Sequence, residues 1–369
     1  MIRSFYLLLA TLLVYCGAVV YKLPLREVKG IRITKIEDGT WAEYIRQIPR
    51  NGTQPLRDFR DARYVSDVTV GTPPQTFSII LDTGSADFWV PSSFCPQCDN
   101  FRKFDSSVSS SYRRDGRRFI IVYGDGAATG FLGIDKFCFG RTGLCYGKQV
   151  FGEATRIPQR NNAPFDGVCG MAFQRLSKFR QPSPYRNIRD SLDKPYFTFW
   201  MQHRERSGEI GGQVTFGGFD DEHCASHINW VPLTRAVHYR FDFDGVSAGD
   251  FVSNQRQTAV SDTGVSFLVG PPEIITGIAN AFRARFDRRL RMFEVDCYAN
   301  HPDIVFSING NRFAIPPVDT ILHIRNKCYL AVGVQRRYPI WFFGDTFIRA
   351  WCTVYDPVEK RIGLAKARP

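Results

Sequence analysis

Residues 80–86 read Ile-Leu-Asp-Thr-Gly-Ser-Ala, and residues 260–266 read Val-Ser-Asp-Thr-Gly-Val-Ser. The two aspartates, Asp82 and Asp262, lie 180 residues apart in a chain of 369 residues. A single Asp-Thr-Gly triplet is also a plain turn, but two copies in matching apolar settings, about half a chain apart, are hard to obtain by accident. The repeat therefore predicts two lobes of similar size, each of which contributes one carboxylate.

A pair of carboxylates can activate a water molecule without a covalent step. One aspartate is ionised and takes the proton of the water, while its protonated partner donates a proton to the substrate carbonyl. Two like charges about 3 Å apart cannot both ionise, so the pair shares one proton. The glycine after each Asp-Thr allows a tight turn, and Thr83 and Thr263 are expected to point inward and connect the loops. The pattern predicts peptide hydrolysis.

Several further motifs resemble those of the pepsin-type (family A1) aspartic endopeptidases, in the same order. They are residues 70–75 (VGTPPQ), 82–85 (DTGS), 88–92 (FWVPS), 123–126 (YGDG), 165–170 (FDGVCG) and 342–345 (FFGD). The resemblance runs from about residue 64 to the C-terminus. It implies a mainly β, bilobal fold with two β-barrel-like lobes and an active-site cleft between them, and it looks most like invertebrate, nematode-type members.

The resemblance also implies the residues of the site. The catalytic pair would be Asp82 and Asp262; the flap and substrate-binding residues would be Tyr123, Gly124, Asp125, Gly84, Gly264, Trp89, Ile80, Phe165 and Val168; the pair would be supported by Thr83, Ser85 and Thr263. The hydroxyl of Tyr123 is expected near Trp89, with an ordinary core tyrosine as the alternative. No metal and no cofactor is implied.

Two positions depart from the family pattern. Asp125 stands on the flap where many relatives have Thr or Ser, and it could face a basic substrate side chain or be a solvated turn residue. Val265 stands where a hydroxyl residue is usual, whereas Ser85 fills the equivalent place in the first loop. A missing donor disfavours the charged form of the nearby carboxylate, so we expect an activity window displaced towards weakly acidic or near-neutral pH.

Length and composition agree with a two-lobed β protein. A chain of this length is too long for one ordinary core, and 31 Phe, 15 Tyr and 31 Gly suit many short strands joined by turns. Apolar alternation predicts strands at residues 64–70 and 76–81, separated by a turn at 71–74. The best helical pattern covers residues 272–286.

The N-terminus has the features of a secretory signal. Arg3 precedes a mostly apolar run at residues 5–14, and small residues follow, so residues 1–18 are interpreted as a signal peptide; a buried core helix is the alternative. The run is too short to span a bilayer comfortably, and nothing later resembles a transmembrane helix. The expected destination is outside the cell or an acidic endolysosomal compartment.

Residues 19–50 resemble a propeptide. Basic residues in such segments pair with an acidic cleft until acid protonates the carboxylates. The Lys-Tyr pair that often plugs the site is missing, and Arg46 or Arg50 could substitute. The alternative is an uncleaved N-terminal strand. The mature protein would consist of an N-terminal lobe, residues 51–220, and a C-terminal lobe, residues 221–369, with a glycosylation sequon at Asn51 that processing could remove.

The formal net charge of +12 is unusual for proteins that work in acid. The basic residues, among them Arg113 to Arg118 and Arg283 to Arg291, are scattered and not interleaved with stacking aromatics. We therefore favour a solvated basic face, which could bind anionic glycans, over nucleic-acid binding. The expected partners are protein or peptide substrates, with no nucleic acid, no stable membrane anchor and a monomeric state.

Of ten cysteines, Cys16 leaves with the signal peptide, and nine remain. The resemblance implies small and large disulfide loops at Cys95–Cys98 and Cys297–Cys328, and a hairpin turn separates Cys138 from Cys145. Cys224 and Cys352 would then pair. Cys169 is left over and is interpreted as a small buried hydrophobe, with a reactive thiol as the alternative. Zinc binding by the Cys-x-x-Cys motif is the rival interpretation of the first pair.

Two other functions remain open at this point. A catalytically silent peptide-binding protein could use the same scaffold, although both aspartates and both following glycines are intact. A narrowly specific processing protease is the other alternative. Cleavage of denatured haemoglobin at acid pH, blocked by pepstatin, would separate active from silent forms.

Overall fold

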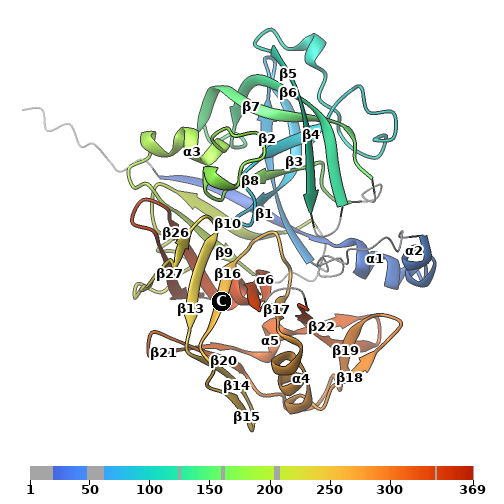
Figure 1. The fold of residues 1–369 in the computed structure, drawn as a ribbon, viewed down its shortest axis with the longest axis vertical. Helices are drawn as coiled ribbons and strands as arrows, with labels where there is room; N and C mark the ends of the chain where they lie inside the picture. The colour runs from blue at the N-terminus through green and yellow to red at the C-terminus, as the bar shows by residue number, and fades with distance from the viewer. Residues whose placement is uncertain are drawn as a thin grey trace, which may run out of the picture.

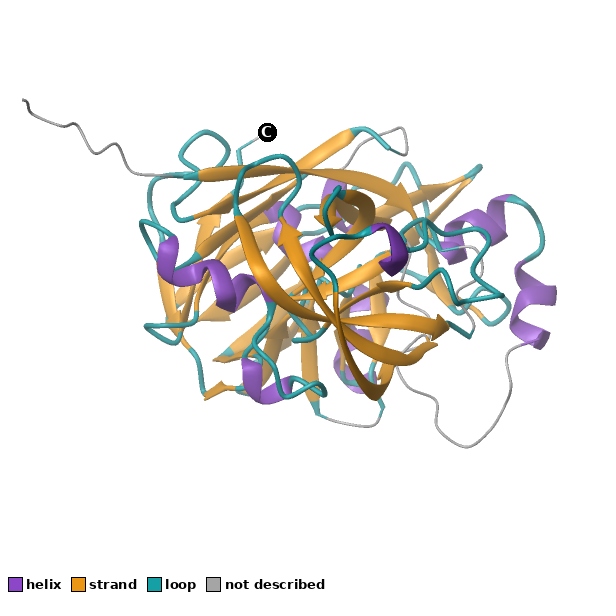
Figure 2. Cartoon of the chain, turned by 90° about the horizontal axis from the view of Figure 1, so that it is seen from above, coloured by secondary structure: helices purple, strands orange, loops and turns teal. Residues whose placement is uncertain are grey.

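The computed structural model describes residues 20–47, 62–123, 126–158, 163–202, 208–336 and 339–368. The predicted signal peptide and Asn51 lie outside these residues. The fold is mainly β and bilobal, as in pepsin: one lobe lies above the other in Figure 1, with long strands running between them. Figure 2 shows strands in both lobes and only short helices.

A thirteen-stranded sheet forms the first lobe and continues beneath both lobes. Its order is β11 (Asn229–Pro232), β27 (Arg361–Lys366), β26 (Trp351–Asp356), β9 (Phe197–Met201), β10 (Ile210–Phe216), β1 (Tyr21–Lys29), β2 (Ala62–Val70), β3 (Gln75–Asp82), β8 (Gly167–Gly170), β4 (Phe88–Pro91), β7 (Cys145–Arg156), β6 (Gly126–Cys138) and β5 (Arg113–Tyr123). Strands β2 and β3 correspond to the two strands predicted from apolar alternation. The last two strands of the chain share this sheet with the first lobe.

The second lobe contains three smaller sheets. The six-stranded sheet has the order β12 (Arg235–Ala236), β13 (Tyr239–Phe243), β16 (Gln257–Ser261), β25 (Ile340–Phe343), β17 (Leu268–Gly270) and β24 (Val332–Val334). One four-stranded sheet has the order β15 (Phe251–Ser253), β14 (Gly245–Ala248), β20 (Ile304–Ile308) and β21 (Asn311–Ile315). The other has the order β18 (Arg285–Asp287), β19 (Met292–Val295), β23 (Lys327–Leu330) and β22 (Ile321–Ile324).

The helices are short. They are α1 (Ile31–Glu37), α2 (Trp41–Gln47), α3 (Pro184–Ile188), α4 (Pro272–Ala281), α5 (Pro317–Thr320) and α6 (Asp345–Ala350), with 3-10 turns at Ser106–Val108, Gln174–Leu176 and Arg189–Ser191. The predicted helix over residues 272–286 was wrong at its end. The chain turns into the left-handed region at Arg283 (φ 52°), which terminates α4, and continues as strand β18.

Aromatic side chains from both lobes form one continuous core. The rings of Phe197 and Tyr355 lie 5.0 Å apart, and those of Tyr239 and Tyr355 lie 4.7 Å apart. The hydroxyl of Tyr239, in the second lobe, donates to the carbonyl oxygen of Met171 in the first, at 3.2 Å. Such pairs stabilise by packing and by ring geometry, so the lobes are joined beneath the site.

The described residues form four disulfides, and these are the four pairs expected in the sequence analysis. They are Cys95–Cys98, Cys138–Cys145, Cys224–Cys352 and Cys297–Cys328. Cys169 is a free thiol and is fully buried. None of the helices in the described ranges has the length and apolar character needed to cross a bilayer.

Candidate active site

Each Asp-Thr-Gly loop follows a strand that has a parallel neighbour. Strand β3 ends at Asp82 and lies parallel to β8, and β16 ends one residue before Asp262 and lies parallel to β25. The backbone N–H of Asp262 donates to the carbonyl oxygen of Phe343, at 3.0 Å, and that of Met171 donates to the carbonyl oxygen of Asp82, at 2.8 Å. The two loops are therefore supported in related ways by the two apolar-apolar-Gly segments.

Each carboxylate accepts a hydrogen bond from its own loop. The N–H of Gly84 donates to Oδ1 of Asp82, at 2.9 Å, and the N–H of Gly264 donates to Oδ1 of Asp262, at 2.8 Å. The Ser85 hydroxyl donates to Oδ2 of Asp82, at 2.5 Å. Donors to a carboxylate favour its charged form, and Val265, at the place of Ser85 in the second loop, offers no hydroxyl.

The two loops are also connected to each other. The N–H of Thr83 donates to the hydroxyl of Thr263, and the N–H of Thr263 donates to the hydroxyl of Thr83, both at 3.0 Å. The Thr83 hydroxyl donates in turn to the carbonyl oxygen of Ser261, and that of Thr263 to the carbonyl oxygen of Leu81. All these groups are buried, so the bonds hold the two loops in one relative position.

The glycines of the two loops lie against the opposite carboxylates. A β-carbon on Gly84 would overlap the carboxylate of Asp262, and one on Gly264 would overlap that of Asp82. The same position on Gly264 lies 2.9 Å from Oδ1 of Asp262. The two inner oxygens thus face each other closely enough for one water molecule to bond to both. Glycine is required at both positions because any side chain would separate the carboxylates.

The expected flap and wall residues come together next to the first loop. The indole N–H of Trp89 donates to the hydroxyl of Tyr123, at 2.8 Å. Tyr123 is the last residue of β5 and packs against a cluster that includes Ile80, Phe165 and Val168, whose side chains are buried. The flap residues Gly124 and Asp125, as well as the side chains of Arg46 and Arg50, lie outside the described part of the structure.

His238 is a neighbour of the pair that no sequence motif indicated. His238 lies in the turn between β12 and β13, close enough to the first loop for the charge of Asp82 to act on its imidazole. Burial lowers the pKa of the half-buried imidazole, and the negative charge of Asp82 opposes this shift. A single histidine between two strands has no spacing signal, so sequence reasoning missed it.

The free cysteine behind the first loop is not a reactive thiol. Cys169 lies opposite Leu81 in the β3–β8 register. Burial raises the pKa of its thiol well above the usual value, and the charge of Asp82 raises it further. The thiolate is the reactive form of cysteine, so Cys169 acts as a small buried hydrophobe.

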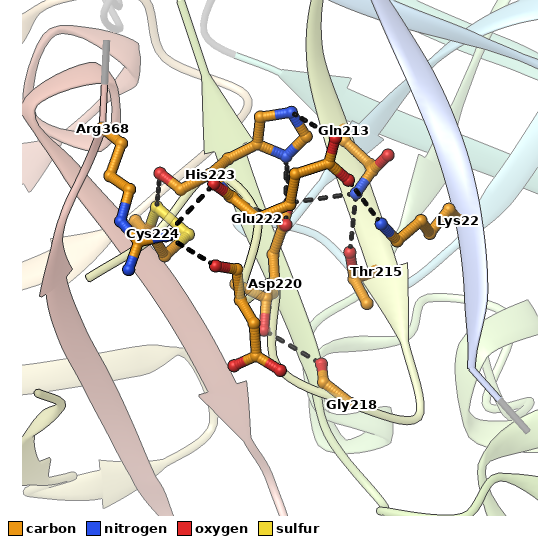
Figure 3. A network of polar contacts seen from close by, with 12 residues as sticks. Lys22, Gln213, Thr215, Gly218, Asp220, Glu222, His223, Cys224 and Arg368 are labelled. Carbon is orange, nitrogen blue, oxygen red and sulfur yellow. Dashed lines mark hydrogen bonds and ion pairs between the residues drawn. A yellow bond between two sulfur atoms is a disulfide. The ribbon is translucent and has the colours of Figure 1, made fainter. Parts of the chain in front are cut away.

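Among the described residues, two clusters each bring together three side chains that could bind a metal, and neither cluster lies at the candidate site. In the first, Cys297 and Cys328 are bonded to each other beside His323, so no thiolate is available. In the second, Asp220 contacts the ring of His223, while Glu222 pairs with Lys22 (Figure 3). The Cys95–Cys98 motif is a disulfide and not a zinc site.

Two Asp-Thr-Gly loops that face each other between two β lobes define the scaffold of a pepsin-like aspartic protease. Comparison with known sequences agrees, since the model of the eukaryotic aspartyl protease family matches residues 63–367. The chain belongs to this family.

Curated relatives match over almost the whole chain. Aspartic protease 17 of Caenorhabditis elegans is 34% identical over 377 residues, which cover 96% of this chain and 96% of the relative. Aspartic protease 1 of Caenorhabditis elegans is 32% identical over 97% of this chain and 98% of the relative. Human gastricsin is 32% identical over 95% of this chain and 96% of the relative. The resemblance to nematode members and to pepsins is thus supported by full-length similarity.

Proposed function

We propose that the chain is an aspartic endopeptidase and that Asp82 and Asp262 are its catalytic pair. The observation that carries the proposal is the symmetric arrangement of the two loops, in which each glycine lies against the opposite carboxylate and each threonine bonds the other loop. A catalytically silent binding protein would not need two carboxylates placed so that both can bond to the same water molecule. Family membership supports the same activity.

The reaction requires only the pair, a water molecule and the peptide. The ionised aspartate takes a proton from the water, whose oxygen attacks the scissile carbonyl, while the protonated aspartate donates its proton to the carbonyl oxygen. In the resulting tetrahedral diol, the ionised carboxylate takes a proton from one hydroxyl, and the other aspartate gives the proton that it took from the water to the amine nitrogen as the C–N bond breaks. The bonds from Gly84, Gly264 and Ser85 orient the carboxylates throughout.

Tyr123 and Trp89 would close the cleft over the substrate. Their mutual hydrogen bond ties the end of β5 to the floor formed by Trp89 and its buried neighbours. We assign the substrate contacts to this wall, with Ile80, Phe165 and Val168 supporting it. A closed cleft excludes water and strengthens the interactions of the developing charges.

We also propose that the protein is made as a secreted zymogen. The proposed segments are the signal peptide at residues 1–18, a propeptide at 19–50, an N-terminal lobe at 51–220 and a C-terminal lobe at 221–369. The positive residue and apolar run at the N-terminus, together with four disulfides, support passage through an oxidising secretory route. Secretion or an acidic endolysosomal compartment would suit the chemistry, and a monomer suffices for it.

The proposed propeptide is part of the fold. Strand β1 lies between β10 and β2, paired with residues 210–216 on one side and with residues 62–65 on the other. Helix α1 packs Ile33 and Ile36 against the second-lobe cluster around Phe267. Trp41 of α2 donates to the carbonyl oxygen of Arg289, also in the second lobe. One segment of fewer than thirty described residues thus contacts both lobes.

Ion pairs of Arg26 and Lys22 attach β1 to the rest of the molecule. The guanidinium of Arg26 forms two hydrogen bonds to the carboxylate of Asp67, at 2.7 and 2.9 Å. Lys22 pairs with Glu222, at 2.8 Å, at the edge of a network around Asp220 and His223 (Figure 3). Arg26 lowers the pKa of Asp67, and Lys22 lowers that of Glu222, because each cation favours the charged carboxylate.

The sign of these shifts sets the pH at which the segment is released. A free Asp67 would bind its proton near the ordinary value of about 4, whereas the Asp67 that holds Arg26 binds it at lower pH. The contact therefore stabilises the attached state above about pH 4 and loses that contribution as the pH falls below it. The proposed zymogen should open in acid.

Acid activation of an Asp67→Asn variant tests this proposal. The variant should release the N-terminal segment at higher pH than the native chain, as followed by gel mobility and N-terminal sequencing. Asp242→Asn is the matched control, because Asp242 pairs with Arg256 inside the second lobe. Activation profiles of Asp67→Asn and native chain that coincide would show that the ion pair does not set the release.

Peptidase activity itself is tested with the acid-treated chain and denatured haemoglobin. Cleavage at several sites that pepstatin blocks would support a general endopeptidase. Cleavage at one site in a panel of proteins would support the alternative of a narrowly specific processing protease. Binding of pepstatin without cleavage of any substrate would support the silent peptide-binding alternative and contradict the proposal.

A further inference from the structure

A short hairpin in the second lobe carries a dense group of arginines. Residues 283–291 contain five arginines and one aspartate. They follow the end of α4 and consist of strand β18 and the turn that leads into β19. We call this segment the arginine hairpin; its members are Arg283, Arg285, Arg288, Arg289 and Arg291, and all five are exposed. The segment lies in the second lobe, in the region labelled β18 and β19 in Figure 1.

Four of these arginines have no acidic partner among the residues that the structure describes. Within the described part of the chain, no carboxylate oxygen lies within 4 Å of the guanidinium groups of Arg283, Arg285, Arg288 or Arg289. The nearby carboxylates are engaged elsewhere. Glu294, opposite Arg285 in the hairpin, pairs with Lys327, at 2.8 Å. Asp287 accepts from the backbone N–H groups of residues 289 and 290. The positive charge of the hairpin is thus directed to solvent.

Two arginines of the hairpin occupy backbone positions that favour glycine. Arg283 has φ 52° and Arg291 has φ 55°. An L residue is uncommon in this region, and glycine would adopt it with less strain. The backbone conformation therefore does not explain why arginine rather than glycine stands at these two positions. A function of the side chain would explain it.

The hairpin borders a cavity of about 630 Å³ between α4 and the β14–β15 turn. Arg283 lines it together with the polar side chains of Asn280, Asn300 and His301 and the ring of Phe251. Asp250 supplies a carboxylate among the lining residues. Amide and guanidinium donors beside an aromatic ring are suited to the hydroxyl and anionic groups of a sugar and to its apolar face.

We propose that the arginine hairpin and this cavity form a binding site for a sulfated polysaccharide. The guanidinium group matches two oxygens of a sulfate or phosphate at once, and it keeps its charge at every relevant pH. Sulfate esters also stay ionised in acid, where carboxylates become neutral. A chain of sulfated sugars would place one residue in the cavity and successive sulfates along the hairpin.

The structure favours a polysaccharide over a lipid surface. Phe286 is the large apolar residue of the hairpin that is exposed, with 51% of its surface accessible, and its ring is held against Phe293, with ring centroids 5.1 Å apart. Membrane docking needs apolar side chains that can enter the lipid as well as positive charge. A single phenylalanine ring that packs on its neighbour offers little apolar surface that could enter the lipid.

Binding is measured with the full-length Asp82→Asn protein, which keeps the site independent of peptidase activity. The probes are heparin, hyaluronan, which has carboxylates but no sulfate, and vesicles of phosphatidylserine and phosphatidylcholine. At roughly 0.15 M salt, which is close to physiological ionic strength, we expect the affinity for heparin to be higher than that for hyaluronan or for the vesicles. Changing Arg285, Arg288 and Arg289 to Gln should weaken heparin binding at least about tenfold.

Two controls separate a binding site from overall charge and from folding. The triple change of Arg113, Arg114 and Arg118 to Gln removes the same charge from exposed arginines of the first lobe and should alter heparin affinity less than about twofold. Arg283→Gly removes a cavity side chain at a left-handed position, so thermal stability should hold while affinity falls.

Three results would overturn the proposal. They are equal weakening by the first-lobe triple variant, vesicle binding that depends on the hairpin while heparin binding does not, and heparin affinity unchanged in the hairpin variants.

Discussion

The hydroxyl of Thr83 accepts a hydrogen bond from the backbone N–H of Thr263, and the hydroxyl of Thr263 accepts one from the N–H of Thr83, at the same distance of 3.0 Å. The contact joins residues 180 positions apart and crosses from one lobe to the other. Since both threonines directly follow the aspartates, this exchange sets how the carboxylates face each other. The geometry of the pair therefore depends on two buried hydroxyl groups.

Thr83→Val should disturb this arrangement without changing side-chain shape. The change leaves the N–H of Thr263 without its acceptor in a buried site, which costs about 1–3 kcal/mol, and it loosens the alignment of the carboxylates. We expect lower unfolding free energy and lower kcat, measured by denaturant titration and peptide hydrolysis. Thr83→Ser keeps the hydroxyl and should stay near native values. Native stability and kcat in Thr83→Val would show that the exchange does not position the pair.

Val265→Thr should move the pH profile of kcat/KM to lower pH. In the first loop the Ser85 hydroxyl donates to Asp82, and a threonine at position 265 would add a comparable donor in the second loop. A donor favours the charged carboxylate, so the acid limb of the profile should shift down. Ser85→Ala should shift it up. A Val265→Thr profile that overlays the native one, or moves to higher pH, contradicts this role of position 265.

Tyr123→Ala should reduce turnover much more than stability. Tyr123 is half-buried at the end of β5 and bonded to Trp89, so its loss opens the cleft but removes little core. We expect kcat/KM to fall by at least about tenfold, with a melting temperature close to native. Tyr123→Phe, which loses the hydrogen bond alone, serves as the matched variant. If Tyr123→Ala unfolds instead, the residue is part of the core and not a flap residue.

Glu153→Gln should stabilise the protein at neutral pH but not in acid. Glu153 is fully buried, and burial raises the pKa of its carboxyl, with a further contribution from the charge of Asp135. Because the pKa of Glu153 is raised in the folded protein, its contribution to stability is fully present below the ordinary pKa of about 4.3. This contribution is lost as the pH rises through the pKa of the folded protein. Glutamine cannot ionise, so the variant does not lose stability in this way.

Melting temperatures of native protein and Glu153→Gln at pH 3.5 and pH 7 measure this effect. We expect the melting temperature of Glu153→Gln, relative to that of the native protein, to be higher at pH 7 than at pH 3.5. Glu359→Gln is the control, since Glu359 is exposed. If Glu359→Gln shows the same relative rise in melting temperature, or if Glu153→Gln shows none, the ionisation of Glu153 does not destabilise the native protein at neutral pH.

The local parts of the site could be predicted from sequence because they depend on short motifs. The Asp-Thr-Gly loops, the supporting segments and the Trp89–Tyr123 contact all follow from residues close together in the chain or from family resemblance. The disulfides could be predicted for the same reason. The family resemblance implied Cys95–Cys98 and Cys297–Cys328, the hairpin turn indicated Cys138–Cys145, and Cys224–Cys352 was the pair that remained.

Contacts between distant residues could not be predicted in this way. The insertion of β1 between β10 and β2 brings Arg26 to Asp67 and Lys22 to Glu222, and no sequence pattern specifies these partners. The approach of His238 to Asp82 depends on how the β12–β13 hairpin packs, which no local pattern specifies. Helix α4 ended early because Arg283 adopts a left-handed conformation, which a periodic apolar pattern does not reveal.

The most direct test of the account is the peptidase activity of Asp82→Asn and Asp262→Asn. Both variants are purified beside Asp242→Asn, which changes an aspartate on β13 outside the pair, and all are compared with native protein on one peptide at acid pH. We expect kcat/KM of the two loop variants to fall below about 5% of native, with unchanged circular dichroism, while the control keeps most of its activity. Substantial turnover by either folded loop variant, with contaminants excluded, would contradict the two-aspartate mechanism.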